Sequence, residues 1–149
     1  MLDTKIPDFT LPATGGQQFS LAAQAGKVVI IYFYPKDSTP GCTTEAQQFR
    51  DLYDRFVAVD AVILGISRDS VKSHDKFCRK FGLSIVLASD ESGQTCEAYG
   101  VWVEKSMYGK KYMGIVRSAF LIQEGVVLHA WYKISPADTP ANLLKALKK

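Results

Sequence analysis

The chain has 149 residues, the size of one domain, and we expect a single domain over residues 1–149. Apolar residues make up 47% and charged residues 22%, an ordinary globular composition that excludes general disorder. The net charge of +3 is too small to predict nucleic-acid binding.

The first half of the chain predicts a hairpin followed by a β-α-β unit. Two alternating segments flank Gly15 and Gly16, which indicates a small N-terminal β-hairpin. Residues 28–34 form a continuous apolar run, which is typical of a central parallel strand buried on both faces. Aromatic residues then recur at helical spacing, and residues 61–66 predict a second buried strand. A parallel strand pair with a helical crossover follows.

The second half predicts alternating helices and strands and a late hairpin. Gly82 ends the first of these helices, and Pro140 lies in the first turn of the last. The predicted elements are helices over residues 70–81, 91–99 and 139–148 and strands over residues 85–88, 116–122 and 126–132. Together they predict an α/β fold with a mixed central sheet and helices on both faces, the layout of a thioredoxin-like domain.

Cysteine usage and apolar runs bear on the compartment. No apolar run is long enough to cross a membrane, and residues 1–5 lack the basic-then-apolar order of a signal peptide. Three cysteines are far too few for a secreted disulfide scaffold. We therefore expect a cytoplasmic protein with reduced thiols and no membrane partner.

Cys42 is the candidate nucleophile. It lies in a polar stretch that connects the first buried strand to a helix, where sites gather in open α/β folds. Thr39 is a favoured N-cap residue and Pro40 a favoured first helical residue, so Cys42 falls in the first helical turn. Unpaired backbone N–H groups and the helix dipole there favour thiolate over thiol. The alternative is a buried, inert cysteine.

Arg117 is the candidate cation. It lies within the predicted strand over residues 116–122, which is otherwise apolar. A fixed cation near Cys42 would stabilise the thiolate and a negatively charged oxygen in a transition state. The alternative is an edge or surface arginine in an ordinary ion pair.

The spacing of Pro35, Thr39 and Cys42 resembles the motif of the peroxiredoxins, and residues 32–45 resemble their bacterioferritin comigratory protein branch, also called PrxQ. Residues 70–77 and 108–117 add further similarity, and the resemblance runs from Pro7 to the last helix. The resemblance implies a thioredoxin fold and a cysteine-based peroxidase that uses no metal, haem or flavin.

The resemblance also implies a role for each matching residue. Cys42 would be the peroxidatic cysteine, which attacks a hydroperoxide and becomes a sulfenic acid while water or an alcohol leaves. Thr39 would offer its hydroxyl to the peroxide, Arg117 would bind thiolate and peroxide together, and Pro35 would shield the pocket from water. Glu45 would support them. The backbone N–H groups near Gly41 and Cys42 would also donate to the developing charge.

A second thiol would resolve the sulfenic acid. Many members of the branch carry this cysteine five residues after the first, where this chain has Gln47. Cys78 and Cys96 remain, and the resemblance favours Cys78, because a second PrxQ pattern places the resolving cysteine in that helix. Cys96 would be a spectator. The alternatives for Cys78 are a core residue and, with His74, half of a metal site.

Three further expectations concern conformational change, the reductant and the oligomeric state. A disulfide needs Cα atoms within about 7 Å, so the helices of Cys42 and Cys78 would have to loosen. The resemblance implies thioredoxin or a related dithiol protein as reductant, and a monomer.

Two other readings remain open. A disulfide oxidoreductase on the same fold would need Cys-x-x-Cys, but Thr43, Thr44 and Glu45 follow Cys42. A binding module with an inert thiol is the other. A lysine cluster, expected to be a solvated loop rather than a partner surface, comprises Lys105, Lys110 and Lys111.

Overall fold

The structure is a computed structural model that describes residues 9–24, 27–83, 85–123, 126–135 and 138–147. The turn predicted at residues 124–125 and the end of the last predicted helix at residue 148 lie outside these ranges. Within the described ranges, no helix is long and apolar enough to cross a membrane.

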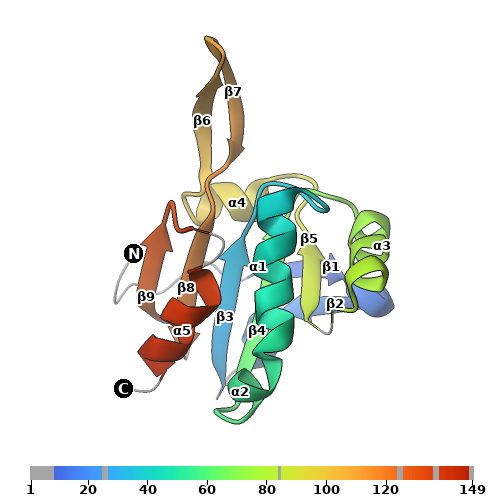
Figure 1. Ribbon diagram of the computed structural model, residues 1–149, viewed down its shortest axis with the longest axis vertical. Helices are drawn as coiled ribbons and strands as arrows, with labels where there is room; N and C mark the ends of the chain where they lie inside the picture. The colour runs from blue at the N-terminus through green and yellow to red at the C-terminus, as the bar shows by residue number, and fades with distance from the viewer. Residues whose placement is uncertain (1–8, 25–26, 84, 124–125, 136–137, 148–149) are drawn as a thin grey trace.

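A mixed sheet forms the centre of the molecule. Its strands are β1 (Thr10–Ala13), β2 (Gln17–Ser20), β3 (Val28–Phe33), β4 (Ala61–Ser67), β5 (Val86–Ser89), β8 (Ser118–Gln123) and β9 (Val126–Tyr132). The strand order is β2-β1-β5-β4-β3-β8-β9 (Figure 1). The central β3, β4 and β5 are parallel, and β8 and β9 are antiparallel additions. This confirms the predicted parallel pair, late hairpin and mixed sheet.

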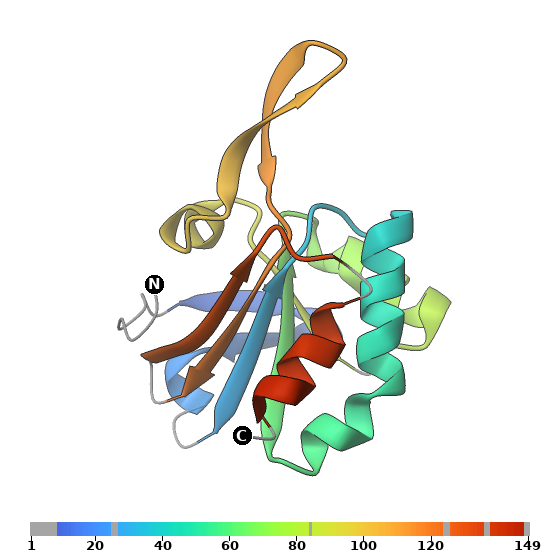
Figure 2. The same cartoon turned by 60° about the vertical axis from the view of Figure 1, so that its left-hand side comes forward.

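Two hydrophobic clusters cover the two faces of the sheet. Side chains alternate along a strand, so β3 sends Ile31 and Phe33 into one cluster and Ile30 and Tyr32 into the other. The second cluster packs under α1 (Pro40–Asp51), α2 (Tyr53–Val57), α3 (Val71–Phe81) and α5 (Thr139–Leu147). The first cluster includes Cys96 from α4 (Gln94–Ala98). Figure 2 shows α1 and α5 on one side and α4 on the other, which confirms helices on both faces.

The observed elements begin and end close to the predicted residues, with local differences. The N-terminal hairpin is confirmed as the β1–β2 pair, and Ala13 joins it to β5 through Ala88. Gly82 ends α3 in the left-handed conformation, as predicted. The short helix predicted over residues 91–99 begins only at Gln94, because Gly93 before it has a φ of 82°.

The largest difference is a projecting arm. Strands β6 (Trp102–Met107) and β7 (Lys110–Ile115) pair with each other alone and extend away from the rest of the molecule (Figure 1). The expected solvated loop with its lysine cluster is therefore a hairpin. The sequence did not predict it, since beyond its base most of the arm is exposed and no apolar alternation is required there. Tyr108 at its tip is 98% exposed.

Candidate active site

Cys42 lies where the sequence predicts it, in the first turn of α1. Thr39 occupies the N-cap position and Pro40 the first helical position, so Cys42 is the third residue of the helix. The thiol is 2% exposed. The hydroxyl of Thr39 donates to the Lys36 carbonyl at 2.8 Å and makes no side-chain cap. The first main-chain bond of α1 runs from Thr43 N to Thr39 O at 2.9 Å, so the Gly41 and Cys42 N–H groups precede the helical ladder.

The Arg117 side chain joins two residues of α1. Its Nη2 donates to Cys42 Sγ at 3.3 Å, and its Nη1 donates to Glu45 Oε1 at 2.7 Å. Burial lowers the pKa of Arg117, but Glu45 and Cys42 together raise that pKa above its ordinary value. The arginine is therefore a permanent cation beside the sulfur.

The backbone of Arg117 corrects one expectation. The residue is not within a strand, because β8 begins at Ser118 and Arg117 lies in the two-residue link after β7. Main-chain bonds hold this link from both sides, from Val116 N to Val101 O at 2.8 Å and from Ile134 N to Arg117 O at 3.1 Å. The backbone of Arg117 is therefore held by the bonds of this link and not by strand pairing. Its side chain extends to Cys42 and Glu45 of α1.

Glu45, the second partner of the Arg117 guanidinium, is fully buried. Burial raises the pKa of Glu45 to about 7, although the charge of Arg117 opposes this. Among the described residues, no hydrogen-bond partner reaches Oε2. The neighbouring Thr139 hydroxyl donates its hydrogen bond to the Ser135 carbonyl at 2.9 Å. A proton on Oε2 would let Glu45 donate to that hydroxyl.

The remaining predicted residues lie outside the hydrogen bonds that join Arg117 to Cys42 and Glu45. Pro35 lies two residues after the end of β3 and is exposed, so its shielding role stays a prediction. Cys78 is half-buried on α3, and burial, then Asp37 and Asp75, raise its pKa to about 11. Cys96 is fully buried, and burial and Asp90 raise its pKa strongly. All three cysteines are free thiols.

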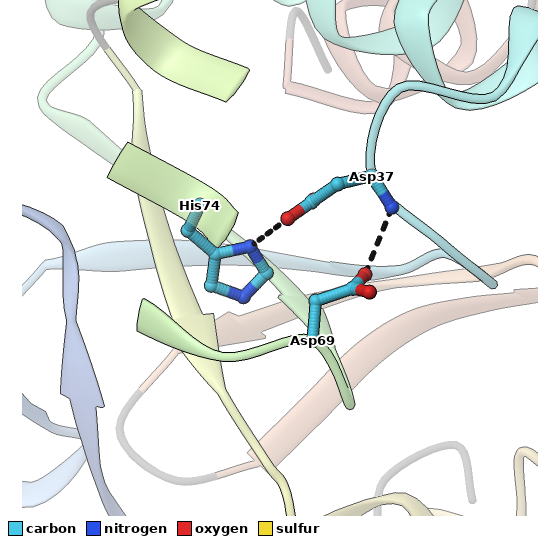
Figure 3. A group of neighbouring side chains, drawn as sticks. All are labelled: Asp37, Asp69 and His74. Atoms are coloured by element: carbon cyan, nitrogen blue, oxygen red, sulfur yellow. Dashed lines mark hydrogen bonds and ion pairs between the residues drawn. The ribbon is translucent and has the colours of Figure 1, made fainter. Parts of the chain in front are cut away.

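Sequence reasoning missed a buried polar cluster around Asp37 and His74 (Figure 3). His74 is fully buried, and its Nδ1 lies 2.7 Å from Asp37 Oδ2. These two residues and Asp69 form the one group of three possible metal ligands within the described ranges, and Cys78 is not in it. The signal in the sequence was the spacing of His74 and Phe77, which places both on the inner face of α3.

Known proteins share this chain's sequence and fold. Residues 2–130 match the AhpC/TSA family. Peroxiredoxin Bcp of Xanthomonas campestris is 51% identical over 142 residues, which cover 95% of this chain and 89% of that protein. A putative peroxiredoxin bcp of Coxiella burnetii is 51% identical over 131 residues, 87% of either chain.

A solved structure of Xanthomonas campestris peroxiredoxin Q matches with a TM-score of 0.89 at 51% identity, over 94% of this chain and 89% of that one. The thioredoxin-like fold is thereby confirmed. Together with a buried thiol beside a fixed guanidinium at a helix start, these similarities establish that the chain belongs to the AhpC/TSA family and, within it, to the Bcp/PrxQ peroxiredoxins.

Proposed function

We propose that this peroxiredoxin reduces hydrogen peroxide and organic hydroperoxides to water and alcohols, with Cys42 as its peroxidatic residue. The observation that carries the proposal is the contact of Arg117 with Cys42 Sγ on one side and Glu45 on the other. A related structure supports the substrate class, since the Xanthomonas campestris bacterioferritin comigratory protein was solved as trapped intermediate and ligand complexes to explain its alkyl peroxide reduction.

The first step transfers one oxygen atom to sulfur. The Cys42 thiolate attacks the terminal peroxide oxygen in line with the O–O bond, the S–O bond forms, and the O–O bond breaks. The leaving oxygen takes up a proton and departs as water or an alcohol, and sulfur is oxidised by two electrons to the sulfenic acid. Negative charge grows on the leaving oxygen, and Arg117 is a fixed cationic donor beside the reacting sulfur.

The neighbours of Cys42 bind and align the peroxide. Thr39 already donates its hydrogen to Lys36 O, so its oxygen is left to accept from the peroxide O–H. The N–H groups of Gly41 and Cys42 donate to the developing charge, as expected of the first turn of a helix. Glu45 holds the guanidinium in place by accepting from Nη1. Pro35 limits the access of water at the edge of the pocket.

Cys78 resolves the sulfenic acid in this proposal. Its sulfur attacks Cys42 Sγ, the S–S bond forms, and the sulfenic oxygen leaves as water. Two cysteine-to-serine mutants of the Xanthomonas campestris protein support the pairing, because the mutated positions are as far apart in that sequence as Cys42 and Cys78 are here. The raised pKa of Cys78 makes it a poor nucleophile in the packed form. Helix α3 therefore loosens before the disulfide forms.

The rest of the cycle follows from an exposed disulfide. Thioredoxin or a related dithiol protein reduces it, which requires a reducing compartment such as the cytoplasm. The proposal includes one domain that works as a monomer, as the sequence resemblance implies.

Mass spectrometry of the peroxide-treated protein tests the proposal. One equivalent of peroxide should yield a Cys42–Cys78 disulfide, and excess peroxide should convert Cys42 of a Cys78→Ser variant to the sulfinic acid. That variant should consume the first equivalent at a near-normal rate and then fail to turn over with thioredoxin. A Cys42–Cys96 disulfide, or normal turnover of the Cys78→Ser variant, would refute the assignment of Cys78.

A further inference from the structure

A dense set of hydrogen bonds surrounds the Asp37 carboxylate. Oδ1 accepts from the Tyr34 hydroxyl at 2.5 Å. Oδ2 accepts from the Ser73 hydroxyl at 2.8 Å and pairs with His74 Nδ1 at 2.7 Å. The other ring nitrogen of His74 lies 2.9 Å from the Ala88 carbonyl, which can only accept, so Nε2 carries a hydrogen. The Asp37–His74 pair therefore holds one proton between Nδ1 and Oδ2.

The cluster joins the two segments that carry the reactive cysteines. Asp37 lies in the loop that leads to the Thr39 cap of α1, and His74 lies one helical turn before Cys78 on α3. Figure 3 shows Asp37 reaching from its loop to the His74 ring. The Asp37 backbone N–H also donates to Asp69 Oδ2 at 2.8 Å, just before α3 begins.

We propose that Asp37 and His74 are a positioning pair, which holds the Cys42 and Cys78 helices in their packed arrangement and thereby sets how fast Cys78 reaches the sulfenic acid. The inference rests on the proposed function, because it assigns a control to the step that joins these two cysteines.

Burial explains why this pair can control a rate. Both side chains are almost completely removed from solvent, at 0% for His74 and 4% for Asp37. Breaking such a pair without replacing it leaves uncompensated polar groups in the interior, whereas an exposed pair has little effect. The pair must separate if the loop before α1 and the Cys78 turn of α3 move apart, so its strength enters the barrier to loosening.

The competing metal-site interpretation fits the geometry less well. The oxygens and nitrogens that would bind an ion already pair with one another, and Asp69 Oδ2 accepts from both Ser67 Oγ and Asp37 N. His74 has one nitrogen on Asp37 and one on a carbonyl. An ion would have to displace these bonds.

Amide hydrogen exchange of the reduced protein, without peroxide, tests the pair directly. Asp37→Asn and His74→Gln should each raise exchange in α1 and α3 at least about tenfold, while β3 and β4 stay as protected as in the wild type. Asp75→Asn is the matched control, because it removes a neighbouring α3 carboxylate whose partner is the Gly15 N–H at 3.2 Å. Its exchange should match the wild type. Unchanged exchange in the first two variants would overturn the proposal.

Rapid-mixing kinetics supply the second readout. Peroxide consumption should change at most about twofold in Asp37→Asn and His74→Gln, whereas formation of the disulfide should be about tenfold faster and less Cys42 should be lost to sulfinic acid. A merely structural defect would slow both steps. Disulfide formation at the wild-type rate or below would overturn the proposal.

Two further arms keep the outcome interpretable. The double variant should be no faster than either single variant, since the residues act as one pair, and additive effects would refute the pairing. If Asp37→Asn does not fold, Tyr34→Phe removes one donor to Asp37 and keeps the ring. It should speed the disulfide step about twofold to threefold, and a wild-type rate would overturn the proposal. A wild type that forms no Cys42–Cys78 bond contradicts the proposed resolution step and with it the rate role of the pair, whereas exchange without peroxide separately tests whether the pair holds the two helices.

Discussion

Cys42 and Cys96 occupy the same position in two different helices. Each is the third residue of its helix, and each thiol is almost completely buried. Their charged neighbours differ. The Cys42 sulfur faces the Arg117 guanidinium, whereas Cys96 faces Asp90, whose carboxylate accepts from the Cys96 N–H at 2.8 Å. A cation stabilises a thiolate and a carboxylate opposes it.

This comparison shows that the same position at a helix N-terminus can place a cysteine beside a cation or beside a carboxylate. In α4 the Asp90 carboxylate is the anion at the helix start, since it accepts from both Thr95 N and Cys96 N. A thiolate at Cys96 would be a second negative charge there. In α1 the proposed mechanism places a peroxide in the corresponding region, and the cation comes from a distant part of the chain.

Replacing each cysteine in turn gives the largest expected difference. Cys42→Ser should abolish peroxide reduction, because a serine hydroxyl is not ionised near neutral pH. Cys96→Ser should retain peroxide consumption and thioredoxin-coupled turnover close to the wild type. Both are measured as peroxide loss in a coupled assay, with circular dichroism as the check on folding. Substantial turnover by Cys42→Ser would remove Cys42 from the nucleophile role.

Removing the cation tests what distinguishes the two sites. Arg117→Ala should lower the second-order rate constant with peroxide on the order of a hundredfold, as for loss of a transition-state donor. An unchanged rate constant with peroxide would mean that Arg117 has only a structural role. Arg68, which lies over the Trp102 ring, provides the control, because Arg68→Ala also removes one positive charge.

Glu45 gives the site a pH-dependent contribution to stability. Its pKa is about 7 in the folded protein, above the ordinary value of 4.5, so the folded state keeps a proton that the unfolded state loses. The free energy of unfolding should therefore fall as pH rises from about 4.5 to about 7, by roughly 3 kcal/mol from this group. Glu45→Gln should lack this fall. Urea denaturation of both proteins from pH 5 to 8 measures it, and parallel curves would contradict the assignment.

The smallest effect is expected near Cys96. Asp90→Asn removes the charge that accepts from Thr95 N and Cys96 N, so the free energy of unfolding should fall by about 1–2 kcal/mol. Peroxide reduction should be unaffected, because Asp90 lies at α4 and not at α1. Thermal or urea unfolding and the coupled assay measure the two outcomes. A loss of peroxidase activity in the folded variant would show that the two sites are not independent.

Much of this could be predicted from the sequence, and the failures have physical reasons. Thr39 and Pro40 mark a helix start locally, so the place of Cys42 in its helix follows from adjacent residues. The charged partner does not, since Arg117 reaches Cys42 across 75 positions. The sequence suggested the meeting only through the resemblance.

The sequence did not predict the polar cluster or the arm, for different reasons. His74 reads as a polar residue, and only its pairing with Asp37, across 37 positions, explains why it is buried. Only the base of the arm meets the core, where Ile115 is buried and Trp102 packs against the first cluster. The rest of the two strands shows no alternation by which a half-buried strand is recognised.

The link that carries Arg117 determines which substitutions the site tolerates. Backbone N–H and C=O groups fix its position, through Val116 N on Val101 O and Ile134 N on Arg117 O. Every amino acid except proline provides these groups, so these two bonds place no demand on the side chain at position 134, and at position 116 the demand comes only from the packing of Val116 against the core. Proline at either position lacks the N–H donor. Such a variant would retain every catalytic side chain and still misplace the cation, so an intact motif in a related sequence would not guarantee a working peroxidase.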